Sequence, residues 1–130
     1  MISLTKARKI IEQIDAAPNK VQDIINESEY GICITDEKGN FRFVSDRYTE
    51  IYGYGRNELI GNSFTMIVPT QDKGYLQDLH DKFISEGAEI SRVWEVQGKG
   101  GKAIKIFADA LFTSSLDGRP HKVTFVELHN

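Results

Sequence analysis

The sequence predicts an α+β domain in which helices cover one face of an antiparallel β-sheet. Two short β-forming runs lie before residue 45, longer β-forming runs lie after residue 89, and the segment between these groups has helical patterning. Within each group, only short turns separate consecutive β runs. Such turns favour antiparallel pairing, because parallel strands need long crossovers. The 130 residues suffice for one domain with a real core and are too few for two ordinary domains.

The first segment, residues 3–16, is predicted to form an amphipathic helix that flanks the domain. Its apolar side chains recur at helical spacing opposite charged and amide side chains, and they are Leu4, Ala7, Ile10, Ile11 and Ile14. Such a strip is too apolar to remain in water, so we expect it to form a homodimer interface with a second chain. The alternative is that it covers the open face of its own sheet. Pro18 ends this helix, so we divide the chain into a flanking helix (1–18) and a domain (19–130).

The first half of the domain is expected to contain a helix, a hairpin and short helical turns. Pro18 suits the first turn of a second helix, because its missing N–H costs nothing there. The apolar runs 32–34 and 41–44 flank a turn around Gly39, as a tight hairpin requires. Ser45 provides a hydroxyl that can cap the short helix after the second strand.

The second half is expected to contain one longer helix followed by three strands. Pro69 opens the helix, and Gly87 is suited to a left-handed stop at its end. Its apolar side is predicted to consist of Tyr75, Leu76, Leu79, Phe83 and Ile84. The strands are expected over 90–96, 103–113 and 122–128. The glycine-rich turn 98–101 joins two strands and lacks the following helix that a phosphate-binding loop needs.

Composition indicates which partners and which cellular compartment to expect. The formal net charge is -3 with both signs mixed along the chain, which argues against nucleic acid, because phosphate binding requires a basic face. Cys33 is the only cysteine, so no internal disulfide can form, as is usual in a reducing compartment. No apolar run approaches the roughly 20 residues that span a bilayer, and the N-terminus lacks the apolar core of a signal peptide. We therefore predict a cytoplasmic protein that does not insert into membranes.

From about residue 21 to residue 128, the pattern resembles a PAS domain, the small sensory module of signalling proteins. The matching motifs are, in chain order, Thr35-Asp36 with Gly39, Phe43-Val44, Gly53-Tyr54, Glu58-Leu59-Ile60-Gly61 and a closing three-strand meander. The sequence departs from the family at Ser45, where many members have Asn. It departs again at Glu127-Leu128-His129, where many members have Asp-Ile-Thr.

The resemblance implies a five-stranded antiparallel sheet in the order 2-1-5-4-3, with helices that enclose a small cavity. It also implies a sensory or regulatory function, through ligand binding or dimerisation, with an effector such as a histidine kinase or a regulator. We expect the cavity wall to comprise Tyr52, Phe64, Met66, Tyr75, Leu79 and Trp94. The alternative is a cofactor-free interaction or dimerisation module whose own aromatic side chains fill the shell.

The family also includes cofactor-binding members, and this sequence matches them poorly. Light-sensing LOV domains carry a reactive Cys just after the bend glycine, where this chain has the stretch 61–66 without a thiol, and Cys33 is expected to be a buried structural thiol. Haem-binding relatives have a His early in the central helix, where this chain has Asp72. His80, two turns later, is expected on a solvated face, and no histidine has metal-ligand spacing. We expect no cofactor, with non-covalent flavin as the next alternative, haem less favoured, and no metal.

The weakest alternative is a small enzyme. Asp109 is the best candidate, because apolar neighbours in a pocket would raise the pKa of its carboxyl group into a useful range for acid–base chemistry. An Asp in a strand more often faces water, which is what we expect of Asp109. No catalytic residue is therefore assigned, and we expect no enzymatic activity.

Overall fold

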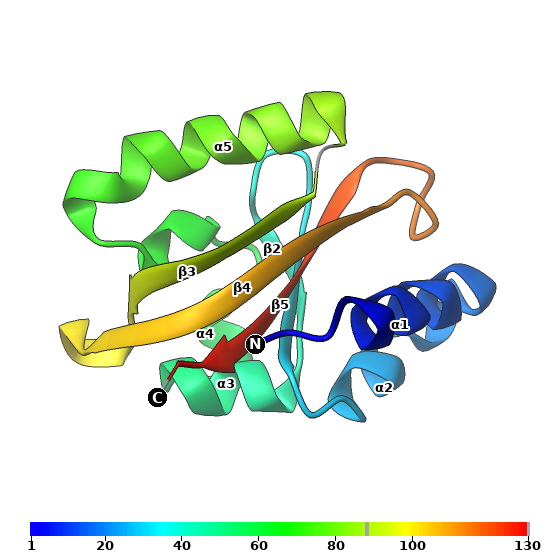
Figure 1. The fold of residues 1–130 in the computed structure, drawn as a ribbon, viewed down its shortest axis with the longest axis horizontal. Helices are drawn as coiled ribbons and strands as arrows, with labels where there is room; N and C mark the ends of the chain where they lie inside the picture. The colour runs from blue at the N-terminus through cyan, green and yellow to red at the C-terminus, as the bar shows by residue number, and fades with distance from the viewer. Residues whose placement is uncertain (88, 130) are drawn as a thin grey trace.

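The computed structural model describes residues 1–87 and 89–129 and confirms the predicted order of helices and strands (Figure 1). Within these residues, no helix combines the length and the apolar character needed to cross a bilayer. The elements, with η for short 3-10 helices, are α1 (Leu4–Ala16), η1 (Pro18–Lys20), α2 (Val21–Asn26), β1 (Gly31–Thr35), β2 (Phe41–Val44), α3 (Asp46–Tyr52), α4 (Arg56–Leu59), η2 (Phe64–Ile67), η3 (Thr70–Asp72), α5 (Lys73–Glu86), β3 (Ile90–Gln97), η4 (Lys99–Gly101), β4 (Ala103–Thr113) and β5 (His121–Leu128).

The strands form one antiparallel sheet in the order β2-β1-β5-β4-β3, as the resemblance implied. In the register of β1 with β5, Thr35 lies opposite Lys122 and Cys33 lies opposite Thr124. Residues directly opposite each other share a face of the sheet. We term the face that carries these four side chains the inner face, and the other face the outer face.

Local sequence explains where the elements begin and turn. The Ser45 hydroxyl accepts a hydrogen bond from the main-chain N–H of Tyr48 and so caps α3. Gly39 has a φ of 92° in the turn between β1 and β2, a left-handed conformation that costs glycine nothing. Gly87 stops α5 in the same region, with a φ of 68°. These turns return each strand antiparallel to its neighbour and set α5 across the inner face.

The sheet separates two apolar cores, and Figure 1 shows α5 and α1 on opposite sides of it. The inner core lies between the sheet and the segment from α3 to α5, and its largest buried members are Phe41, Tyr48, Tyr52, Leu59 and Phe64. The outer core lies under α1 and α2, and its members include Ile14, Ile25, Ile32, Ile34 and Phe125. The segment from α3 to α5 therefore packs on the inner face, and α1 and α2 pack on the outer face.

The N-terminal helix packs on the outer face of its own sheet. Ala7 and Ile14 are fully buried there, and Ile10 and Ile11 are partly buried against the same core. Leu4 remains 43% exposed. The strip thus covers the sheet, which was the alternative to a contact with a second chain. Ala7 and Ile14 are not accessible to a partner in this packing, and homodimerisation stays a prediction.

Candidate ligand-binding site

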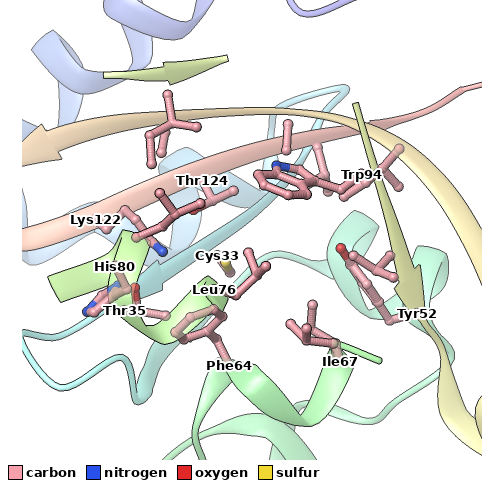
Figure 2. A pocket seen from close by; sticks show the side chains of 18 of the residues that line it. Cys33, Thr35, Tyr52, Phe64, Ile67, Leu76, His80, Trp94, Lys122 and Thr124 are labelled. Carbon is pink, nitrogen blue, oxygen red and sulfur yellow. The ribbon is translucent and has the colours of Figure 1, made fainter. Parts of the chain in front are cut away.

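A cavity of about 90 Å³ lies between the inner face of the sheet and the helices α3, η2 and α5 (Figure 2). Apolar side chains form much of its wall, among them Ile67, Val68, Leu76, Ile106 and Ala108. One water needs roughly 10–15 Å³ on this measure, whereas pockets for drug-sized ligands begin at roughly 300 Å³. The cavity is therefore suited to a ligand of only a few non-hydrogen atoms.

Four of the six side chains predicted for the wall line the cavity, namely Tyr52, Phe64, Leu79 and Trp94. Met66 packs against the inner core instead. Tyr75 is 51% exposed, and its hydroxyl accepts a hydrogen bond from the Arg92 guanidinium. Leu76 takes the place expected of Tyr75, because positions 76, 79, 80 and 83 share one face of a helix.

Lys122 is a buried cation that the sequence analysis missed. It is 9% exposed and extends from β5 so that its Nζ atom lies 4.4 Å from the centre of the Phe64 ring. Burial lowers the pKa of Lys122 to about 8, and its Nζ has no hydrogen-bond or ion-pair partner among residues 1–87 and 89–129. Burying an ion costs several kcal/mol, of which a cation–π contact returns roughly 0.5–2 kcal/mol. The ammonium group therefore lacks a full counterpart within the described chain.

His80 is fully buried, so the expectation that it lies on a solvated face is wrong. Its Nε2 atom lies 3.0 Å from the main-chain oxygen of Asp36 and 3.1 Å from that of Glu37. Nε2 must donate to these carbonyls, which makes Nδ1 an acceptor in the neutral ring. Burial, followed by the charge of Lys122, lowers the pKa of His80 to about 4, so the ring is neutral at pH 7. Nδ1 is buried and has no partner in the described chain.

Thr35 adds a hydroxyl to the same end of the cavity. Its Oγ1 atom is buried without a hydrogen-bond partner among the described residues, and the side chain lies opposite Lys122 across the sheet. Figure 2 shows Thr35, His80 and Lys122 together at one end of the cavity, with Tyr52 at the other. Buried polar atoms are nearly always hydrogen-bonded in folded proteins. This end of the cavity therefore holds two buried polar atoms that have no partner among the described residues.

The cavity wall also contains polar groups that are uncharged. Burial raises the pKa of the Cys33 thiol and of the Tyr48 and Tyr52 hydroxyls, so all three stay protonated at neutral pH. Cys33 is buried in β1, as predicted for a structural thiol. A protonated, buried thiol is a poor nucleophile. These three side chains therefore add neutral hydrogen-bonding groups to the cavity wall.

A family model described as PAS fold matches residues 19–126. The chain belongs to the PAS family. A search of curated proteins found no match. The solved structures that resemble the chain include the PAS domain of an HTR-like protein from Haloarcula marismortui, with a TM-score of 0.73 and 17% identity over 95% of this chain and 99% of that one.

Two further solved PAS domains also resemble the chain. The PAS domain of a two-component sensor histidine kinase has a TM-score of 0.70 and 16% identity over 88% of this chain and 98% of that one. The PAS domain of Bordetella pertussis BvgS has a TM-score of 0.71 and 11% identity over 88% of each chain. At these identities the structures establish a shared fold.

Asp109 lies outside the cavity of this PAS domain. It is 8% exposed, so the expectation that it faces water is wrong, and its carboxylate accepts a hydrogen bond of 2.9 Å from the Ser91 hydroxyl. Side chains alternate along β4. Because Ala108 and Ala110 line the cavity, Asp109 belongs to the outer face. The enzyme alternative required this carboxylate inside the pocket, whereas the structure places it on the opposite face of the sheet.

The cavity does not fit the large cofactors of the PAS family. A flavin or haem ring system requires far more room than about 90 Å³. His80 lines the cavity, but its Nε2 atom is engaged by the turn between β1 and β2, so it could ligate haem iron through that atom only by losing these contacts. In the part of the chain that the structure describes, no cluster of three or more His, Cys, Asp or Glu residues could hold a metal ion.

Proposed function

We propose that this PAS domain is a sensory or regulatory module in which a small ligand binds the cavity on the inner face. The observation that carries this proposal is the polar end of the cavity, where the Thr35 hydroxyl and the His80 Nδ1 atom are buried without partners and the largely buried Lys122 forms no ion pair among the described residues. A ligand that supplied those partners would remove the cost of leaving them unpaired. PAS domains are generally sensory and non-enzymatic modules, so we propose no catalytic role.

The signal would pass through the sheet to α1. Side chains of β1 alternate between the cavity, where Cys33 and Thr35 lie, and the outer core, where Ile32 and Ile34 contact the region under α1. A ligand changes the packing of α1 only if it binds one arrangement of these strands more tightly than another. We propose that occupancy of the cavity biases α1 between two such packings.

An effector protein or domain would read this change. A histidine kinase or a regulator is the partner that we propose, since one of the similar PAS domains belongs to a sensor histidine kinase. We also propose a cytoplasmic homodimer, in which the exposed Leu4 on α1 contributes to the contact between chains. The competing function is a cofactor-free interaction module, which the small volume of the cavity favours.

Filling the cavity provides the test. Ala108 lines it from β4, so Ala108→Leu should occupy the space without disturbing the outer core. We expect small carboxylates or small neutral molecules, represented by acetate, propionate, acetamide and ethylene glycol, to shift amide resonances around the cavity and in α1 of the intact chain. Ala108→Leu should keep the fold and lose these shifts. If no probe of either class produces them, or if they persist in Ala108→Leu, the cofactor-free module is the better description.

A further inference from the structure

The charges around the cavity decide which class of ligand fits it. Lys122 is the cation of the wall, and His80 is neutral at pH 7 because burial keeps its pKa near 4. Asp72 and Glu95 also line the cavity, but among the described residues neither forms an ion pair with Lys122. The polar end therefore presents one positive charge, which a ligand with one negative charge would balance. A dianion would leave a second buried charge uncompensated.

Resting on the proposed ligand-binding function, we infer that the cavity binds a small monocarboxylate, whose carboxylate pairs with Lys122 and accepts a hydrogen bond from Thr35. A carboxylate has two acceptor oxygens, which suit one ammonium and one hydroxyl donor. Thr35 and Lys122 lie opposite each other in the β1–β5 register, so both can reach one such group.

The remaining wall favours a short apolar tail on that carboxylate. Beside its polar groups, the cavity is lined by aliphatic side chains and an indole, among them Ile67, Val68, Leu76, Trp94, Ile106 and Ala108. An inorganic anion of comparable size would also place oxygen atoms against these aliphatic side chains, which carry no hydrogen-bond donors. A chain of two to about four carbon atoms fits both the apolar surface and the cavity volume of about 90 Å³.

The test is a titration of the intact chain, labelled at lysine, with acetate, propionate, acetamide and inorganic phosphate. We expect acetate and propionate to shift the Lys122 side-chain resonances saturably and to raise the pKa of Lys122 from about 8 by at least about one unit, a tenfold change in proton affinity. Acetamide has the same size but no charge, so it should bind at least about tenfold more weakly. Phosphate should leave these resonances unchanged.

Two variants separate the role of Lys122 from a general effect of lysine charge. Lys122→Met keeps an unbranched side chain that is one atom shorter and removes the charge, and we expect it to weaken acetate binding at least about tenfold. Lys105→Met is the matched control, because Lys105 is exposed on β4 and stays outside the cavity wall. It should bind acetate as the unmodified chain does. The titration of the unmodified chain decides the question even if Lys122→Met fails to fold.

The possible outcomes distinguish the ligand class from the proposed function. If acetamide binds as tightly as acetate and Lys122→Met changes neither affinity, the carboxylate inference is overturned while the sensory pocket stands. If phosphate binds and acetate does not, the cavity selects an inorganic anion and the carboxylate inference is overturned. If none of the carboxylate, amide, glycol and phosphate probes binds at the cavity, the inference and the proposed function both fail.

Discussion

Along β1 and β5, the two faces of the sheet differ sharply in chemistry. On the outer face, Ile32, Ile34 and Phe125 are fully buried in an apolar core. On the inner face, the alternate positions carry polar side chains, including Thr35 and Lys122, around a cavity. Outer-face residues thus gain stability from packing, whereas inner-face residues leave hydrogen-bonding groups unused.

Buried polar atoms without a hydrogen-bond partner also lie mainly on the inner side of the sheet. Among the described residues, three buried side-chain atoms lack a hydrogen-bond partner, and two of them belong to Thr35 and His80 in the cavity wall. The third, an oxygen of Glu127, lies 3.1 Å from the N-terminal ammonium group, whose charge compensates it. The difference teaches that the inner face retains polar groups at a cost in stability that the outer core avoids.

The largest effect is expected from the outer core. Phe125 is fully buried there, so Phe125→Ala should lower the free energy of unfolding by about 3–5 kcal/mol, through lost apolar burial and a new cavity. Urea denaturation monitored by circular dichroism measures this change. Phe112→Ala is the matched control, because Phe112 is 37% exposed and should cost much less. Equal losses in the two variants would contradict the view that burial in the outer core makes Phe125 important for stability.

The next largest effect is expected on the free energy of unfolding at alkaline pH, because Lys122 titrates there. Burial lowers its pKa from 10.5 to about 8, so between these values the unfolded chain binds more protons than the folded chain. The stability contributed by this group must therefore rise with pH across that window. At about 1.4 kcal/mol per pKa unit, the gain is roughly 3 kcal/mol. We expect this gain from urea denaturation at pH 8 and pH 10.5, relative to Lys122→Met.

The comparison with Lys122→Met removes the contribution of the tyrosines and the other lysines, which titrate in both proteins. Lys105→Met, which changes an exposed lysine, should show the same pH dependence as the unmodified chain. If Lys122→Met and the unmodified chain have parallel stability curves, Lys122 is not desolvated in solution. The polar end of the cavity would then be open to water, and the contrast between the two faces would weaken.

Much of the fold could be predicted from turn residues and periodicity. Apolar runs bounded by turn residues identified the strands, and Gly39 and Gly87 identified points where the chain reverses or a helix ends. The placement of α1 was harder, because an apolar strip on a helix has the same pattern whether it covers its own sheet or a second chain. The register that brings Ala7 and Ile14 onto this sheet depends on long-range packing, which a local pattern does not contain.

The polar part of the site was missed for a different reason. Polar residues in a predicted core were assigned to the surface, although His80 is four residues after Leu76 and three before Phe83, the spacing of one helical face. Lys122 likewise alternates in phase with Thr124 and Val126, which also line the cavity. Periodicity could therefore have indicated both residues, but the absence of a partner for each could be seen only in three dimensions.

The smallest effect compares two buried threonines on opposite faces. The Thr35 hydroxyl lacks a partner in the described chain, so Thr35→Val, which keeps the shape of the side chain, should stabilise the protein by about 1 kcal/mol. The Thr113 hydroxyl donates to the Asp15 carboxylate at 2.7 Å, so Thr113→Val should destabilise it by a similar amount. Thermal unfolding of both variants measures the two signs. Saturating acetate should cancel the advantage of Thr35→Val, because the bound carboxylate accepts the hydrogen bond that Thr35 otherwise lacks. A loss of stability in both variants would mean that the Thr35 hydroxyl already has a partner and that the inner face is as well satisfied as the outer one.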